Sequence, residues 1–186
     1  MTWFLFIWAS PARKKRKLSA GPRSVHKAMS VHEAIDVEIS QMKRADLESV
    51  IEIEKASFPT PWSRYAFLAE LYENRRARYF VAREKARGDI VGYVGTWLIL
   101  DEAHITNIAV HPGFRRKGIG KKLMLAAIDY AESQGVGAVT LEVRASNIIA
   151  QSLYEKIGFV SVGIRPGYYH DDGEDALIMW RTQQGK

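Results

Sequence analysis

Cysteine is absent from this chain of 186 residues, which excludes disulfide bonds and thiolate metal sites. The five histidines show no paired ligand spacing, so we expect no metal cofactor. Long apolar runs are also absent: the stretch from Trp3 to Trp8 is far shorter than the ~20 residues that span a bilayer. Basic residues follow this stretch, which reverses the order of a secretory signal. We therefore expect a cytoplasmic protein without a transmembrane segment.

Acidic residues are absent from the first 30 positions, although the whole chain carries 21. The same positions hold seven of the 27 lysines and arginines, which leaves 20 basic and 21 acidic residues for the remainder. The net charge of +6 therefore belongs to the N-terminal segment. Because the remainder is nearly neutral, we expect no stable nucleic-acid complex of the folded part.

Residues 1–36 form a predicted basic leader. The cluster from Arg13 to Lys17 fits a nuclear address, a nucleic-acid contact or a membrane-surface contact. The plainer interpretation is a disordered segment, or a start codon assigned too early, with Met29 or Met42 as the true start. We expect one domain over residues 37–181, long enough to bury a sizeable core, and a short tail at 182–186.

Hydrophobic periodicity and turn residues predict an alternation of strands and helices over this domain. Ser63 is the predicted N-cap of the second helix. The predicted strands cover residues 37–42, 79–83, 90–100, 104–110, 138–143, 159–164 and 176–181, and the predicted helices cover 46–58, 64–72, 121–134 and 148–156. This order favours an α/β fold with a twisted, mostly antiparallel sheet and helices on both faces.

Residues 115–120, with the sequence Arg-Arg-Lys-Gly-Ile-Gly, connect a predicted strand to a predicted helix. Backbone N–H groups of the turn and of the first helical turn face one spot there, and the helix dipole and basic side chains add positive potential. Gly118 and Gly120 allow a phosphate to approach the backbone, or adopt a φ that a side chain would forbid. The pattern indicates a site for a phosphate-bearing cofactor, although ordinary strand–helix connections also contain glycine and basic residues.

Four segments, taken in order, resemble the GNAT superfamily of N-acetyltransferases. The R-x-x-G-x-G pattern at 115–120 is similar to the acetyl-CoA loop of that superfamily. Three others resemble its ribosomal-protein-alanine N-acetyltransferase branch and the archaeal and eukaryotic N-terminal acetyltransferases: 141–147 (L-E-V-R-A-S-N), 152–159 (S-L-Y-E-K-I-G-F) and 168–176 (Y-Y-H-D-D-G-E-D-A). The resemblance covers roughly residues 37–181.

The resemblance implies the GNAT fold, in which the strand ending at Val110 and the strand holding Glu142 run parallel and splay apart. It implies acetyl-CoA as the cosubstrate, with its pantetheine arm paired to the exposed strand edge. The cofactor-binding residues that it implies are Ile108, Ala109, Val110, Arg115, Arg116, Lys117, Gly118, Ile119, Gly120, Lys121 and Asn147. Taken by itself, Asn147 is a predicted N-cap of the helix that follows it.

Glu142 is the predicted base. The alternation in residues 141–144 places Glu142 and Arg144 on the face opposite Leu141 and Val143. A charged residue in a central strand lines a cleft or is paired, so the pattern leaves open a Glu142–Arg144 surface pair. The resemblance implies that Glu142 is the proton acceptor, acting through a water.

Tyr154 is the predicted acid. Its position alone favours a core aromatic side chain packed beside Leu153 and Ile157. The resemblance implies instead that its phenol donates a proton to the coenzyme A sulfur. The site must assist this transfer, since a phenol of pKa ~10 and a thiol of pKa ~8.5 make it uphill by about 2 kcal/mol.

Two further segments are predicted to flank the acceptor peptide, again from the resemblance. The first is the loop that contains Phe58 and Trp62, and the second is the hairpin that begins with Tyr168 and Tyr169. Trp62 also fits a simple loop anchor. If the chain is extended at the two tyrosines, their side chains point to opposite faces, so that one can pack while the other reaches a ligand.

We expect a monomeric enzyme that transfers acetyl from acetyl-CoA to the α-amine of a protein N-terminus, such as the alanine of a ribosomal protein. The transfer is expected to be direct, within a ternary complex. One alternative is a GNAT enzyme that acts on a small-molecule amine or a lysine. Another is a non-catalytic protein that binds acyl-CoA or nucleic acid. The presence of both Glu142 and Tyr154 argues against an inactive protein.

Overall fold

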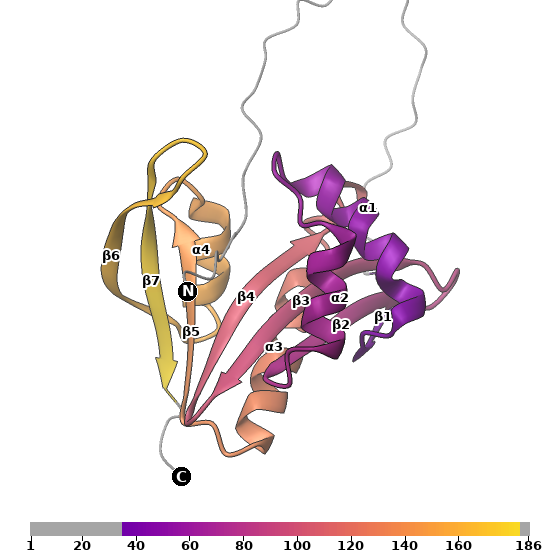
Figure 1. Cartoon of the computed structure of the whole chain (residues 1–186), viewed down its shortest axis with the longest axis horizontal. Coiled ribbons are helices and arrows are strands. Elements are labelled where there is room, and N and C mark those ends of the chain that lie inside the picture. Colours follow the sequence, from indigo (N-terminus) through magenta and orange to yellow (C-terminus); the bar gives the residue numbers. More distant parts are fainter. Residues whose placement is uncertain (1–34, 183–186) are drawn as a thin grey trace, which may run out of the picture.

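The structure, a computed structural model, describes residues 35–182 (Figure 1). Nearly all of the expected leader at 1–36 and of the expected tail at 182–186 lies outside the described residues. The domain limits at 37 and 181 therefore stay predictions. No helix within the described range is long and apolar enough to cross a membrane.

The elements follow one another in the predicted order, with strands first and strand–helix alternation later. They are β1 (Val37–Gln41), α1 (Leu47–Ser57), α2 (Arg64–Tyr72), β2 (Ala77–Glu84), β3 (Ile90–Ile99), β4 (Glu102–Val110), α3 (Ile119–Ser133), β5 (Ala138–Arg144), α4 (Ile148–Glu155), β6 (Val160–Tyr169) and β7 (Glu174–Thr182). Short 3-10 turns precede α1 at Arg44–Asp46 and follow β4 at Pro112–Phe114.

All seven strands belong to one twisted sheet with the order β1-β2-β3-β4-β5-β7-β6 (Figure 1). Every neighbouring pair is antiparallel except β4 and β5, which are parallel. The α3 helix connects these two strands, as a parallel crossover requires. The prediction of a mostly antiparallel sheet with one parallel pair is confirmed.

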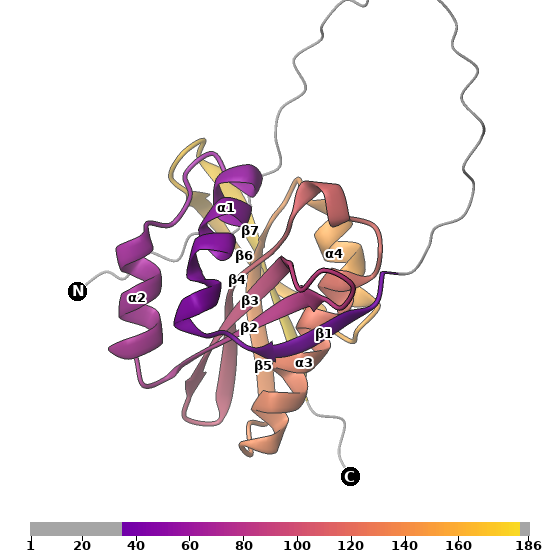
Figure 2. The same ribbon diagram turned by 90° about the vertical axis from the view of Figure 1, so that its right-hand side faces the viewer.

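Helices cover both faces of the sheet, as predicted (Figure 2). The α1 and α2 helices pack on one face, in a core cluster that includes Leu47, Phe67 and Tyr93. The α3 and α4 helices pack on the other face, in a larger cluster that includes Leu123 and Tyr154. Both clusters are completed by apolar side chains of the strands between them, which is how the three layers hold together.

The predicted start of α2 is confirmed at Ser63. Its side-chain hydroxyl accepts a hydrogen bond from the Ala66 N–H at 3.1 Å, so it satisfies one of the unpaired donors of the first turn. The α3 helix begins differently, because Gly118 occupies the N-cap position with a left-handed φ of 79° and offers no side chain. The N-terminus of α3 therefore keeps its first N–H groups without a capping side chain.

The β6 strand extends further than predicted. The sequence pattern ended it at residue 164, before Pro166 and Gly167, whereas the structure continues it to Tyr169. A proline is tolerated here because β6 is an edge strand, with β7 as its only neighbour. The pairing register shifts between Arg165 and Tyr169, and Gly167 has a φ of 59°, so the strand is irregular at this point.

Candidate functional site

The candidate site lies at the end of the sheet where β4 and β5 diverge (Figure 1). The two strands are in register from Glu102 opposite Ala138 to Ile105 opposite Leu141, and no further. Beyond this point β4 runs on to Val110 and β5 to Arg144. The predicted splayed pair is thus present, and it leaves backbone groups of β4 without a neighbouring strand on that side.

The predicted strand residues Ile108, Ala109 and Val110 are buried along this edge of β4. They pair on their other side with residues 92–94 of β3. Ile108 and Val110 belong to the core under α3, and Ala109 belongs to the core under α1. Their side chains are therefore committed to packing, and only backbone groups remain to meet a ligand in the gap.

The connection between β4 and α3 holds the predicted phosphate loop. Within residues 35–182 the backbone N–H groups from Gly118 to Lys121, at the start of α3, have no backbone acceptor. Arg116 and Gly118 have left-handed φ values of 66° and 79°, which turn the loop sharply before the helix. A run of unpaired N–H groups at a helix N-terminus is a binding site for an anion such as a phosphate.

The basic side chains of this loop do not all point to one place. Arg115 turns inward: its Nε donates to the Val110 carbonyl at 3.0 Å, and its Nη2 donates to the Ser57 hydroxyl at 3.2 Å. Burial lowers the pKa of Arg115. Arg116 and Lys121 are exposed, and the Lys117 ammonium lies 5.5 Å from the centre of the Phe114 ring. The outward cations are thus the ones available to a phosphate.

The remaining loop residues have different surroundings. Ile119 is buried in the core under α3. Gly120 is in the first turn of that helix, where an added Cβ would lie 3.5 Å from the Leu153 side chain of α4. The N-terminal end of α3 and the α4 helix therefore adjoin each other beside the gap. Of the two predicted glycines, Gly118 adopts a φ that side chains rarely adopt, whereas an added Cβ at Gly120 would make only an ordinary van der Waals contact.

Asn147 caps α4, as its position predicts. Its Oδ1 accepts a hydrogen bond from the Ala150 N–H at 3.1 Å. The side chain is buried, and its Nδ2 has no hydrogen-bond partner among the described residues. A buried amide with a free donor is uncommon, and it fits a second role in which Nδ2 donates to a ligand.

Glu142 is buried in β5, with 6% of its surface exposed. Its neighbours Leu141 and Val143 belong to the core under α3 and α4, so Glu142 points to the opposite face, as the alternation predicts. Its Oε1 lies 3.2 Å from the guanidinium of Arg165 on β6. Arg144 is buried as well, so the interpretation of a surface pair with Glu142 does not apply.

Tyr154 is in α4 on the other side of β5, with its ring 6.0 Å from that of Phe159. The side chain is almost fully buried in the larger core cluster, which is the packing that its position alone favours. Burial raises the pKa of its phenol well above the usual value. Tyr154 is therefore neutral at physiological pH and still carries the proton that an acid must donate.

Tyr168 and Tyr169 lie together at the end of β6. Their rings meet edge to face with centres 5.2 Å apart, instead of lying on opposite faces of a regular strand. The register shift at residues 165–169 explains this difference. Both hydroxyls are buried and have no hydrogen-bond partner within the described residues.

The two tyrosines lie near charged and titratable side chains of the candidate site. Burial is the main cause that raises the pKa of Tyr169, with Arg144 opposing it and Tyr168, Tyr154 and Glu142 adding to it. Burial also raises the pKa of Tyr168, with a further rise from Glu142 and a decrease from Arg165. Tyr169 thus lies near the predicted acid and the predicted base, and Tyr168 lies near the predicted base.

Phe58 and Trp62 lie in the loop between α1 and α2, at the same end of the molecule as the hairpin between β6 and β7 (Figure 1). The Trp62 ring packs against Phe67 with ring centres 5.5 Å apart, which is the loop-anchor contact. Phe58 is partly buried against the same core cluster. Both residues therefore pack against the core cluster on this face of the sheet.

Glu54, which the sequence pattern did not single out, supports this loop. The residue is 2% exposed, and its carboxylate accepts hydrogen bonds from the Trp62 N–H at 2.8 Å and from the Tyr93 hydroxyl of β3. Burial raises the pKa of Glu54 to about 7, and the Trp62 hydrogen bond opposes this rise. A signal was present, because Glu54 follows the buried Val50 and Ile51 at helical spacing and is therefore a charge on the apolar face of α1.

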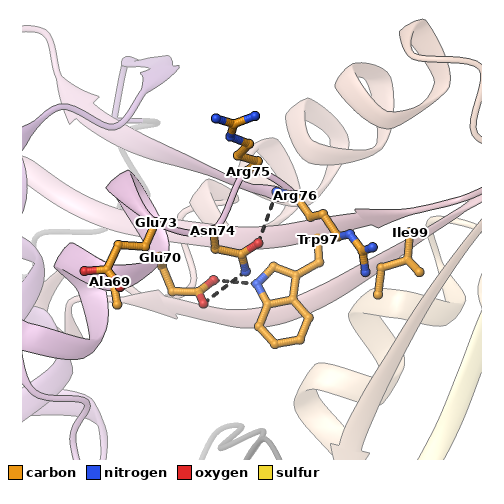
Figure 3. Close-up of a pocket in the computed structure, with 8 residues that line it drawn as sticks. All are labelled: Ala69, Glu70, Glu73, Asn74, Arg75, Arg76, Trp97 and Ile99. Atoms are coloured by element: carbon orange, nitrogen blue, oxygen red, sulfur yellow. Dashed lines mark hydrogen bonds between the residues drawn. The ribbon is translucent and has the colours of Figure 1, made fainter.

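A separate pocket of about 660 Å³ lies between the end of α2 and the neighbouring ends of β2 and β3 (Figure 3). Its lining residues are Ala69, Glu70, Glu73, Asn74, Arg75, Arg76, Trp97 and Ile99, and it includes no predicted site residue. The carboxylate of Glu70 is occupied by the Trp97 indole N–H and by the Asn74 amide at 3.2 Å. The bond to Trp97 connects α2 to β3, and the bond to Asn74 lies at the C-terminal end of α2.

Comparison with known proteins gives consistent matches. A family model described as the acetyltransferase (GNAT) family matches residues 47–159. A Bacillus subtilis protein, provisionally named a [ribosomal protein bS18]-alanine N-acetyltransferase, is 43% identical over 144 residues, which are 77% of this chain and 94% of that protein. The Escherichia coli K12 protein named [ribosomal protein bS18]-alanine N-acetyltransferase is 39% identical over 143 residues, which are 76% of this chain and 94% of that protein.

A solved structure agrees with these matches. The crystal structure of the ribosomal-protein-S18-alanine N-acetyltransferase from Escherichia coli superposes with a TM-score of 0.72 at 37% identity. The superposition covers 81% of this chain and 97% of that chain. The similarity therefore extends over nearly the full length of that protein.

Proposed function

The chain belongs to the GNAT family of acetyltransferases and is an acetyl-CoA-dependent N-acetyltransferase, and from this premise we propose that its acceptor is the α-amine of a protein N-terminus. The two similar proteins are named as alanine N-acetyltransferases of ribosomal protein bS18, and we propose an N-terminal acceptor in a protein of that kind here. The observation that carries the proposal is the buried carboxylate of Glu142, on the strand that diverges from β4 at the opening.

We propose that acetyl-CoA binds along the opening between these strands. The unpaired N–H groups from Gly118 to Lys121 would hold its phosphates, and backbone groups of residues 108–110 would pair with the pantetheine arm. The free Nδ2 of Asn147 would donate a hydrogen bond to the cofactor. These residues fit the cofactor because each offers donors that the protein leaves unused. Bound acetyl-CoA supplies the acetyl thioester.

Glu142 is proposed as the base, because a direct transfer needs a neutral amine. A protein α-amine has a pKa of about 7.7–8.0, against about 10.4 for lysine, so its neutral fraction at neutral pH is larger by roughly two to three powers of ten. One carboxylate, reached directly or through a water, is enough to remove the remaining proton. A protein N-terminus is thus a more suitable acceptor than a lysine for a site with a single carboxylate of this kind.

Tyr154 is proposed as the acid that protonates the departing sulfur. It lies across β5 from Glu142, so the strand end separates the proposed base from the proposed acid. Because burial raises the pKa of the Tyr154 phenol, the phenol is a weak acid. We therefore propose that it donates its proton while the carbon–sulfur bond breaks.

The acceptor peptide is proposed to enter between the Phe58–Trp62 loop and the hairpin that follows Tyr168 and Tyr169. The two segments flank the diverging strands (Figure 1), and the tyrosine hydroxyls are buried donors without partners among the described residues. Such hydroxyls can bind the backbone of a peptide whose N-terminus reaches Glu142.

Turnover of acetyl-CoA against a peptide panel tests the proposed function. The peptides differ in their first two residues, and an N-terminally blocked peptide with an internal lysine is the control. We expect turnover with free N-termini, with alanine among the preferred first residues, and little with the blocked peptide. Preference for the blocked lysine peptide, or for a small-molecule amine, would contradict the proposal.

A further inference from the structure

Arg144, at the end of β5, is a buried charge surrounded by carboxylates of the β6–β7 hairpin. Only 4% of the residue is exposed. Its Nη2 donates to both oxygens of Asp171 at 2.7 Å, and its Nη1 donates to Asp172 at 2.9 Å and to Glu174 at 2.8 Å. The guanidinium carbon also lies 3.8 Å from the centre of the Tyr169 ring. One side chain of the sheet therefore contacts four residues of the hairpin.

Arg144 and the surrounding carboxylates stabilise each other's charged forms. Burial alone would lower the pKa of Arg144, but the hydrogen bonds to Asp171, Glu174 and Asp172 outweigh burial and raise it. In turn, the Arg144 guanidinium holds the pKa of Asp172 below its usual value. A buried arginine with several hydrogen-bonded carboxylates is strongly held, because breaking the contacts would leave an uncompensated charge inside the protein.

The cluster lies beside the proposed reaction site. Arg144 is two residues from Glu142 on the same strand and therefore shares its face of the sheet. Tyr169 stacks on the guanidinium, and Tyr168 contacts Tyr169 edge to face. Because neither tyrosine hydroxyl has a hydrogen-bond partner in the described range, the position of the two rings depends on packing and on two guanidinium contacts, of Arg144 with Tyr169 and of Arg165 with Tyr168.

Glu174 extends the connection to the cofactor side. Besides Arg144, its carboxylate accepts the N–H of Ser146 at 2.6 Å. Ser146 directly precedes Asn147, the cap of α4. The hairpin is thus attached to the strand end that carries the proposed base and to the loop that leads to the proposed cofactor contact.

We propose that Arg144 is a positioning residue that holds the β6–β7 hairpin, and with it Tyr168 and Tyr169, in the arrangement that binds the acceptor peptide. The inference rests on the proposed function, in which this hairpin borders the peptide. Arg144 contacts neither the peptide nor the reacting atoms in this scheme. Its loss should therefore weaken peptide binding and leave the binding of acetyl-CoA in place.

Full-length Arg144→Gln and Arg144→Lys variants test the proposal. We expect Arg144→Gln to raise the KM for the peptide by about tenfold or more, with a smaller change in kcat, because a displaced binding group misplaces the substrate. Arg144→Lys should recover part of this loss, since it keeps the charge but not the planar fork. Calorimetry should show acetyl-CoA affinity within about twofold of the wild type in both variants.

A second variant covers the case in which Arg144→Gln does not fold. The double variant Asp171→Asn, Asp172→Asn keeps Arg144 and its bond to Glu174, and removes two exposed or partly exposed carboxylates. It should also raise the peptide KM. The control is Arg83→Lys, which alters an ion pair with the buried Asp46 at the β1–β2 edge of the sheet. This control should leave the peptide KM unchanged.

Hydrogen exchange of the backbone amides of residues 167–174 gives a readout that needs no peptide. Exchange should be faster in the Arg144 variants and unchanged in Arg83→Lys. Unchanged exchange and unchanged peptide KM in the Arg144 or double variants would overturn the inference, as would an equal rise of KM in Arg83→Lys. Absence of peptide acetylation by the wild-type chain would instead refute the proposed function, while the exchange result would still test whether Arg144 holds the hairpin.

Discussion

Two buried carboxylates, those of Glu142 and Glu54, have different surroundings. Glu142 is in a strand, beside the Arg165 guanidinium, at the end of the sheet where the strands diverge. Glu54 is in a helix and accepts hydrogen bonds from Trp62 and Tyr93, with burial as the main influence on its pKa. The first is suited to accept a proton from a substrate, and the second is suited to hold a loop.

Replacing Glu142 by glutamine tests its role as the base. We expect kcat to fall by about tenfold to several-hundredfold, with acetyl-CoA affinity nearly intact, because a general base contributes roughly this much. Steady-state kinetics over pH 6–9 and calorimetry measure the two quantities. Glu155→Gln on the exposed side of α4 is the control. Wild-type kcat across this pH range would remove Glu142 from the mechanism.

Glu54 should make the folded state less stable as pH rises. Its pKa of about 7 in the folded protein is above the ordinary value of 4.5, so between these values the unfolded chain releases a proton that the folded chain keeps. The free energy of unfolding should therefore decrease from about pH 4.5 to about pH 7, by up to about 3 kcal/mol from this group.

Urea unfolding of the wild type and of Glu54→Gln at pH 5, 6, 7 and 8 measures this effect. The glutamine of the variant cannot ionise, so the decrease should be smaller in the variant than in the wild type. Glu48→Gln, an exposed position on the same helix, is the matched control. The same pH dependence in the wild type and in Glu54→Gln would show that Glu54 does not titrate in this range.

At the scale of the elements, the β4–α3 connection depends on a left-handed backbone conformation at Gly118. Gly118 has a φ of 79° and nothing within 4 Å of an added Cβ, so a side chain there is limited by conformation and not by space. The neighbouring N–H groups remain unpaired because the loop turns through this residue before the helix begins. A change at this position therefore alters the direction of the donors that are proposed to hold phosphate.

Gly118→Val should reduce acetyl-CoA affinity by at least about tenfold and lower the free energy of unfolding by about 1–3 kcal/mol, since a β-branched residue is strained at positive φ. Gly88→Val is a matched control, because Gly88 has a φ of 78° and open space but lies in the β2–β3 turn. It should lose similar stability and keep its affinity in calorimetry. Equal affinity in both variants would contradict the role of the loop.

At the scale of the whole molecule, the proposed binding segments lie together at one end of the sheet. The phosphate loop, the α1–α2 loop and the β6–β7 hairpin are far apart in the sequence, and the divergence of β4 and β5 gives them a common opening (Figure 1). The described core clusters and all proposed site residues lie within residues 35–182. Activity should therefore depend on this part of the chain.

A chain that begins at Met29 should keep the melting temperature of the full chain and acetylate the same peptides. If the seven basic residues before it contribute, they should do so through charge, and the difference should fade as salt is added. Melting curves and peptide turnover of both chains at low and high salt decide the question. A lower melting temperature, or a salt-independent loss of turnover, would contradict the expectation.

The sequence by itself determined the order of the elements, the cap at Ser63, the face of the sheet that carries Glu142 and the glycine turn before α3. These features depend on local periodicity, on capping residues and on glycine conformation, which short segments express without knowledge of the rest of the chain. The end of β6 was one exception: a local pattern cannot show that Pro166 lies on an edge strand, because strand order is a property of the sheet.

The tertiary structure alone decided which partners the buried charges have. Arg144 meets Asp171 from 27 residues further along the chain, and Glu142 meets Arg165 from the edge strand. It also decided that Arg115 turns inward to Ser57 and that Glu54 supports the Trp62 loop. A sequence shows that a charge must be paired when it is buried, but the partner depends on how distant segments pack, and that follows only from the folded chain.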